Sequence, residues 1–146
     1  MHPNRYDPER RAEQRAALQR LRRAQLVEAR RIRQAVADTC LLTPARLRAP
    51  CRVAVLAEAR QVAMYLMRTR LTWPRPTRNG AFPATRIGRL LGHRDHSTIM
   101  HGVAVIAARL ASGRGEDAAL RQMVRAIGAT LDATYEGEGV PRQRAA

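Results

Sequence analysis

The chain has 146 residues, enough for one domain and an added arm, and 45% of them are hydrophobic, so a buried core can form. Aromatic residues make up only 3%, which indicates a core of packed helices with aliphatic side chains and argues against a large sheet. The formal net charge is +15 and every basic residue is an arginine, so the expected partner is nucleic acid or an anionic membrane surface.

A membrane is the weaker of these two partners. No apolar run approaches the roughly 20 residues that a bilayer-spanning helix needs. The first residues are polar and charged, unlike a secretory signal. Cys40 and Cys51 form no Cys-x-x-Cys pair, so we expect two reduced thiols. We therefore expect a cytoplasmic, nucleoid-associated protein without membrane contact and without a cofactor.

The first expected element is a long helix over residues 9–38. Asp7-Pro8-Glu9 predicts its start, because Asp is a favoured cap and Pro fits the first turn. The first half is dense in arginine and poor in apolar residues, so residues 1–25 are expected to form a basic arm or helix that is solvated or frayed. This arm could bind DNA phosphates, or a protein such as RNA polymerase or a replication factor. A solvated helix face is the simpler interpretation.

Two further helices are expected over 44–48 and 52–70, with Thr43 as the cap of the first. Residues 72–83 contain three prolines and an Asn-Gly pair, which predicts an irregular loop. We expect Trp73 to pack on the helices. The arginines of this loop would lie in solvent or, less simply, on DNA.

The next expected element is a short helix over 84–91, ended by Gly92. Asp95 or Ser97 is then expected to cap a longer helix that reaches Ala111. Two helices joined by a tight turn form the helix-turn-helix arrangement.

The last helix is expected over 116–133, and the tail 135–146 is expected to be disordered. All expected elements are helices, so the expected fold class is all-α. Residues 26–134 would form one multi-helix domain that contains the helix-turn-helix.

The polar block Arg94-Asp95-His96-Ser97-Thr98 stands at the start of the second helix of this pair. The first turn of a recognition helix enters the major groove, where short polar side chains contact base edges. Five polar residues ahead of a buried apolar face fit that role. The alternative is an ordinary helix whose first residues only cap it.

Two stretches resemble a known family. The sequence from Gly88 to His101, with its Arg-Asp-His-Ser-Thr core, resembles the signature of the C-terminal DNA-binding domain of DnaA, the bacterial replication initiator. Arg60-Gln-Val-Ala-Met64 resembles a second block of that domain. The resemblance covers about residues 26–133 and implies a Trp-repressor-like, multi-helix fold that binds double-stranded DNA.

The resemblance also implies roles for individual residues. Contacts to bases are implied for Arg52 in the minor groove and for Asp95, His96 and Ser97 in the major groove. Contacts to the DNA backbone are implied for Gln61, Arg68, Arg94, Thr98 and His101. The family's target is an asymmetric, A·T-rich box that a single copy of the domain binds.

This sequence departs from the family in several places. The loop over 72–83 is longer than the family's, and Glu58-Ala59 replaces a usual Arg-Pro. Because the chain has no lysine, it has no Gly-x-x-x-x-Gly-Lys-Ser/Thr loop, so we expect no ATP binding and no ATPase module. We expect a regulator of transcription or of replication initiation that is not an enzyme, with transcription control in a phage-like element slightly favoured.

Two other classes of function fit parts of the sequence. A sequence-indifferent architectural DNA- or RNA-binding protein would depend on arginine–phosphate contacts alone. A nuclease or other small enzyme would use the histidines near Asp95, but their spacing matches no common zinc pattern and convergent carboxylates are lacking. We therefore expect no metal ligands and no catalytic residues.

Overall fold

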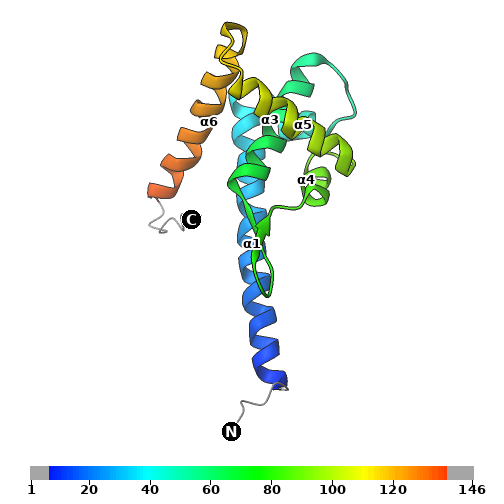
Figure 1. Ribbon diagram of the computed structural model, residues 1–146, viewed down its shortest axis with the longest axis vertical. Helices are drawn as coiled ribbons and strands as arrows, with labels where there is room; N and C mark the ends of the chain where they lie inside the picture. Colours follow the sequence, from blue (N-terminus) through cyan, green and yellow to red (C-terminus); the bar gives the residue numbers. More distant parts are fainter. Residues whose placement is uncertain (1–6, 138–146) are drawn as a thin grey trace.

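The computed structural model describes residues 7–137, with side chains described to residue 133 (Figure 1). Helices account for nearly all of the secondary structure, so the expected all-α class is confirmed, with one small strand pair added. The elements in chain order are α1 (Pro8–Thr39), α2 (Pro44–Arg48), α3 (Ala54–Arg70), β1 (Thr72–Pro74), β2 (Asn79–Ala81), α4 (Ala84–Leu90), α5 (His96–Ala111), the 3-10 turn η1 (Gly115–Asp117) and α6 (Ala118–Gly137).

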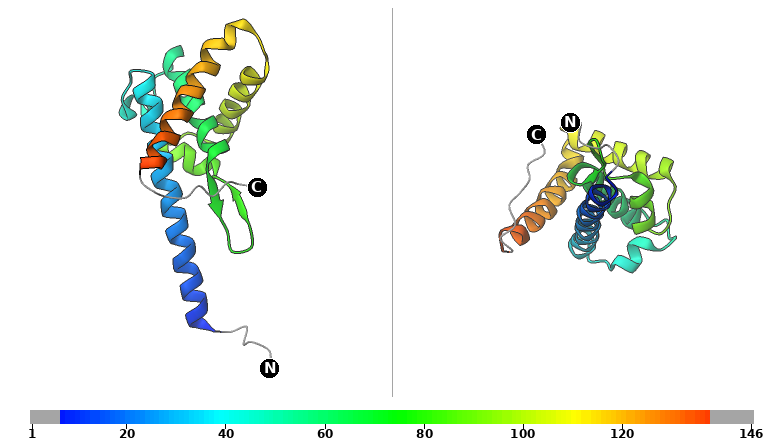
Figure 2. Two further views of the ribbon diagram at one scale, coloured as in Figure 1. Left: turned by 90° about the vertical axis from the view of Figure 1, so that its left-hand side faces the viewer. Right: turned by 90° about the horizontal axis from the view of Figure 1, so that it is seen from below.

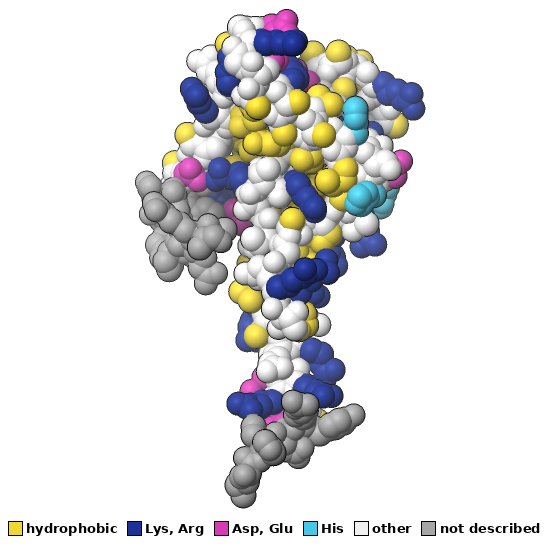
Figure 3. All heavy atoms as spheres, viewed as in Figure 1, with side chains coloured by type: hydrophobic (Ala, Val, Ile, Leu, Met, Phe, Trp, Pro, Cys, Tyr) yellow, Lys and Arg dark blue, Asp and Glu magenta, His cyan; other side chains and the backbone are white. Residues whose placement is uncertain are grey.

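Helix α1 begins where the sequence predicts. The Asp7 side chain accepts hydrogen bonds from the backbone N–H groups of Glu9 and Arg10, at 3.0 and 3.3 Å. Its N-terminal half projects beyond the other elements and is covered with arginine side chains (Figures 1 and 3). Of the two expected alternatives the described residues show a solvated helix, which runs unbroken from Pro8 through Gln25 into the core.

The core forms where α3 packs against α5 and the C-terminal half of α1. Large, fully buried side chains come from α1 to α5 and from the end of the strand pair: Ile32, Leu47, Met67, Phe82, Ile87, Ile99 and Ile106. Helix α6 covers the other side of α1 (Figure 2) and buries Leu120, Ile127 and Leu131 there. Helices α4 and α5 thus lie on the side of α3 away from α6 (Figure 1).

The segment expected to be an irregular loop contains an antiparallel β-hairpin, so that expectation is wrong. Thr72 pairs with Ala81, and Trp73 pairs with Gly80. The backbone N–H of Arg75 donates to the carbonyl of Arg78 at 2.9 Å and closes the turn. A two-stranded ribbon has an outer edge on each strand, so its prolines break no ladder further out.

Trp73 attaches this hairpin to the helices. Its indole is buried, as expected, and the guanidinium groups of Arg22 and Arg86 lie over its ring, at 5.1 and 4.5 Å from the ring centroid. The ring of Phe82 meets it edge-on, at 5.6 Å and 81°. Arg22 also donates through Nε to the carbonyl of Pro74 at 3.0 Å, so the hairpin is held against α1 (Figure 2).

The turn between α4 and α5 is close-packed. Gly92 has a φ of 91°, in the left-handed region that favours glycine, and a Cβ there would collide with the carbonyl of Arg48. A Cβ at Gly88 would collide in the same way with the carbonyl of Arg94. These two glycines let the backbone of the helix-turn-helix fold back on itself and on the segment that follows α2.

Arg60 fixes the end of α2 and the chain that follows it, residues 46–51. Its side chain is only 4% exposed and donates hydrogen bonds to four backbone carbonyls. The acceptors are the carbonyls of Arg46 (3.3 Å), Leu47 (2.7 Å), Ala49 (2.5 Å) and Cys51 (2.5 Å). The end of α2 and the irregular chain after it are therefore held in one conformation by a single buried cation.

Two boundaries differ from the sequence expectation. Helix α3 begins at Ala54, so Arg52 lies in extended chain ahead of the helix and not in its first turn. Helix α6 extends to Gly137, so Tyr135 is helical and not part of a disordered tail. The rest of that expected tail, 138–146, lies outside the described residues, as do residues 1–6 of the expected arm.

Substitution of Gly92 tests the close packing of the turn. Gly92→Ala is expected to lower the free energy of unfolding by roughly 3 kcal/mol or more, because it adds a collision with Arg48 to the strain of a positive φ. The matched control is Gly113→Ala, which has a φ of 65° and open space around it, so only about 1 kcal/mol of strain is expected. Urea denaturation measures both, and equal losses would contradict this account of the turn.

Replacement of Arg60 tests the hold on residues 46–51. Arg60→Met is expected to cost at least about 3 kcal/mol of unfolding free energy, because four carbonyls lose their donor. Arg30→Met on the exposed face of α1 is the control and is expected to change stability by no more than about 0.5 kcal/mol. Similar urea midpoints for the two variants would show that water replaces the guanidinium without loss.

Candidate nucleic-acid interface

The first turn of α5 is built around Asp95. This residue is the N-cap, and its Oδ1 accepts a hydrogen bond from the backbone N–H of Thr98 at 2.7 Å. The structure therefore selects Asp95 over Ser97 as the cap. The bonds from Thr98, backbone first and then side chain, hold the pKa of the Asp95 carboxyl below its usual range. The carboxylate at the helix N-terminus thus stays ionised at neutral pH.

The side chains of this turn point away from the core. Asp95, His96, Ser97 and Thr98 are all exposed, whereas Ile99 is completely buried. His101, one turn further along, is exposed as well. Histidine side chains gather at the right-hand edge of Figure 3, over α4 and α5. The expected base-contacting residues of α5 therefore share one polar, solvent-facing surface at the start of the helix.

The opposite side of α5 packs closely on α3. A Cβ at Gly102 would meet the Sδ atom of Met64 and would lie 3.2 Å from Cγ of Gln61. Gln61 is thus half-buried where the two helices cross. Among the residues expected to contact the DNA backbone, Gln61 is the one that lies against Gly102 in the contact between α3 and α5.

Arg94 is already engaged within the protein. Its Nε donates to the carbonyl of Leu91 at 2.9 Å, and its Nη2 donates to the carbonyl of Ala49 at 3.0 Å. Ala49 also accepts from Arg60, so two guanidinium groups share one carbonyl. Arg94 therefore joins the helix-turn-helix to the segment that leads to Arg52.

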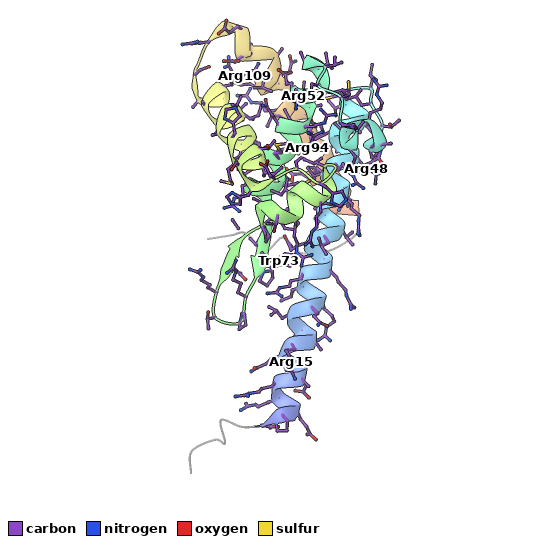
Figure 4. The ribbon with its side chains drawn as sticks, turned by 90° about the vertical axis from the view of Figure 1, so that its right-hand side faces the viewer. Arg15, Arg48, Arg52, Trp73, Arg94 and Arg109 are labelled. Carbon is purple, nitrogen blue, oxygen red and sulfur yellow. The ribbon has the colours of Figure 1, made fainter. Side chains whose placement is uncertain are left out.

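Arg52 itself is exposed. Figure 4 shows it on the same side of the molecule as Arg94 and Arg48, next to the start of α3. The carbonyl of the preceding residue, Cys51, is one of those held by Arg60. The base-contacting candidates thus fall into two groups, the turn at the start of α5 and the extended segment at Arg52, which Arg60 and Arg94 tie together.

A basic hollow of about 430 Å³ lies beside the first turn of α5. Polar side chains from four elements or their connections line it: Arg68, Arg75, Arg78, Asn79, Thr85 and His96. Arg68 is half-buried there and donates through Nη1 to the carbonyl of Phe82 at 2.8 Å. The sequence does not predict this hollow, because it depends on the hairpin bringing Arg75 and Arg78 close to α5.

Within residues 7–137 no three His, Cys, Asp or Glu side chains gather closely enough to hold a metal ion. In the same part of the chain, no helix has the length and apolar character to cross a membrane.

Comparison with known proteins agrees with the geometry. The bacterial DnaA helix-turn-helix model matches residues 29–106. Over 85 residues the chain is 34% identical to the chromosomal replication initiator protein DnaA of Spiroplasma citri, covering 58% of this chain and 17% of that protein. Over 100 residues it is 33% identical to the DnaA protein of Paraburkholderia phymatum, covering 68% of this chain and 17% of that protein. The DnaA protein of Burkholderia vietnamiensis matches to the same extent.

The chain thus spans about a sixth of the length of these relatives. The matched residues run from the second half of α1 through the turn to Ile106 in α5, which includes both candidate base-contacting groups. The match takes in more than half of the chain, and the resemblance noted in the sequence is confirmed. The chain belongs to the bacterial DnaA helix-turn-helix family of double-stranded DNA-binding domains.

Proposed function

We propose that this protein binds double-stranded DNA sequence-specifically at a site resembling the DnaA box, and that it regulates transcription or replication initiation without catalysing a reaction. The observation that carries the proposal is the first turn of α5, where four exposed polar residues precede a completely buried Ile99. A recognition helix needs such a turn to place short side chains against base edges in the major groove.

The chemistry of this turn suits base recognition. Asp95 would accept from a cytosine amino group, His96 would donate to a purine N7 or O6, and Ser97 would form a hydrogen bond with a base edge. A carboxylate has about four acceptor sites, so the bond from Thr98 to Asp95 leaves capacity for a base. The cap and the base contact are therefore compatible.

Arg52 would supply the contact in the minor groove. A narrow A·T-rich minor groove has a strongly negative potential that attracts arginine. The extended segment before α3 presents this side chain to solvent, and Arg60 holds the carbonyl of neighbouring Cys51. A fixed spacing between Arg52 and α5 would let one copy of the domain contact both grooves of one site.

The remaining candidates would position the duplex through its phosphates. Arg68, Thr98 and His101 reach solvent around the start of α5. Arg94 donates two N–H groups to Leu91 and Ala49, and three of the five on a guanidinium remain for a phosphate. Gln61 lies partly beneath α5, so it would reach the backbone only through its terminal amide.

Regulation would follow from occupancy of the site. A bound domain blocks other proteins from the same DNA or brings a partner to it. The exposed half of α1 offers a surface for such a partner, for which RNA polymerase and a replication factor are the two candidates. The competing possibility is sequence-indifferent binding, which the net charge of +15 favours.

A binding measurement separates these possibilities. We expect the full chain to bind a duplex with a DnaA-type box about 10³-fold more tightly than a scrambled duplex of equal composition, at near-physiological salt. Fluorescence anisotropy with labelled duplexes measures both affinities. Equal affinities, together with no enriched sequence in a selection from random DNA, would leave arginine electrostatics as the whole of the binding.

Two substitutions of Asp95 separate its role in the cap from its role on a base. Asp95→Ala should cost about 1 kcal/mol of stability, whereas Asp95→Ser should cost far less because serine also caps helices. Both should lose about 1–3 kcal/mol of discrimination at the contacted base pair. Urea denaturation and anisotropy on single-base variants of the site measure the two effects. Wild-type discrimination by Asp95→Ser would show that Asp95 acts on the helix alone.

A further inference from the structure

We propose that the β-hairpin Thr72–Ala81 is a second DNA-contacting element, which binds backbone phosphates beside the groove that α5 occupies. The inference rests on the proposed function in one respect, that a duplex lies against the start of α5. It adds a contact that the helix-turn-helix does not provide, from the segment that joins α3 to α4.

The position of the basic hollow is the first argument. His96, the first residue of α5, lines it together with Arg75 and Arg78 of the hairpin. A duplex that receives His96 in its major groove therefore has its nearest backbone next to these two arginines. In Figure 4 the hairpin extends below α4 and α5, with Trp73 at its base beside α1.

The charge of the hollow is the second argument. Three guanidinium groups line it, from Arg68, Arg75 and Arg78, and no Asp or Glu is among its lining residues. Asn79 and Thr85 add neutral hydrogen-bond donors. Guanidinium groups with neutral donors around them match phosphate oxygens, and the open concave form suits a continuous backbone.

The attachment of the hairpin is the third argument. Arg22 and Arg86 both hold their guanidinium groups over the ring of Trp73, and the backbone N–H of Thr72 donates to Oε1 of Gln25 at 2.9 Å. Arg68 holds the carbonyl of Phe82 where the chain leaves the hairpin. Since the ribbon is tied to α1, α3 and α4, little backbone entropy remains to be lost when its arginines meet DNA, and the main cost is the ordering of their side chains.

A charge-matched pair of double variants tests the inference. Arg75→Gln/Arg78→Gln removes the two exposed arginines of the hairpin, and Arg114→Gln/Arg125→Gln removes two exposed arginines next to η1 and on α6, away from α4 and from the first turn of α5. Both variants lower the net charge equally. Urea midpoints close to that of the wild type establish that each variant is folded.

The readout is the dependence of DNA affinity on salt concentration. Two lost phosphate contacts should reduce the slope of log K against log[salt] by about 1.8 and weaken binding on the order of tenfold for the hairpin variant. The control should keep the wild-type slope, with an affinity change of less than about twofold. A hairpin variant that behaves like the control would overturn the inference.

Hydroxyl-radical footprinting locates the contact. On the wild type's preferred duplex, the hairpin variant should lose protection at one flank and keep the protection beneath α5. Loss of protection across the whole site would show that Arg75 and Arg78 support the contact made by α5 and form no separate contact, and it would overturn the inference. Inorganic phosphate should not bind measurably to the free protein in calorimetry at 1 mM; tight binding that the hairpin substitutions abolish, with DNA affinity unchanged, would assign the hollow to a free anion.

These outcomes distinguish the two proposals. Sequence discrimination with identical salt slopes for both double variants would leave the proposed function standing without the hairpin contact. A reduced slope for the hairpin variant without discrimination by the wild type would keep the hairpin contact and overturn sequence-specific binding. A wild type that binds no DNA would overturn both.

Discussion

The buried guanidinium of Arg60 is the constraint on which the rest of the interface depends. Removal from water lowers the pKa of Arg60, and nearby Arg94 lowers it further, yet an arginine remains charged in a protein. Four backbone carbonyls compensate that charge. As a result, residues 46–51 are fixed in a position where Gly92 packs on Arg48 and where the side chain of Arg52 is exposed to solvent.

Close packing on α3 orients α5. The absence of a side chain at Gly102 lets α5 approach Met64 on α3, which turns the polar first turn outward. Asp95 then has two roles in the proposed function, as the N-cap at which α5 begins and as a hydrogen-bond acceptor for a base. Most substitutions of Asp95 would therefore weaken both the helix cap and the base contact. Only a residue that also caps helices, such as serine, would remove the base contact and keep the cap.

Much of this arrangement follows from local sequence. Asp7-Pro8 and Thr43-Pro44 predict helix starts because a cap and a proline act within one turn, and both caps form as expected. The Arg-Asp-His-Ser-Thr block predicts the position of the exposed turn.

The hairpin and the burial of Arg60 could not be predicted from local sequence. The strands of the hairpin have three residues each, too short for an alternating pattern, and the side chains that hold Trp73 come from α1 and α4. Burial of Arg60 is equally hidden, since arginine is mostly exposed in proteins.

Trp73 is the only tryptophan in the chain, and it lies where the hairpin meets the helices. Its emission therefore originates from one place, a buried indole with the guanidinium groups of Arg22 and Arg86 over its ring. If the hairpin detaches from α1, the indole enters water and its fluorescence spectrum shifts to the red. Intrinsic tryptophan fluorescence thus reports, without an added label, whether the hairpin is packed on the projecting helix.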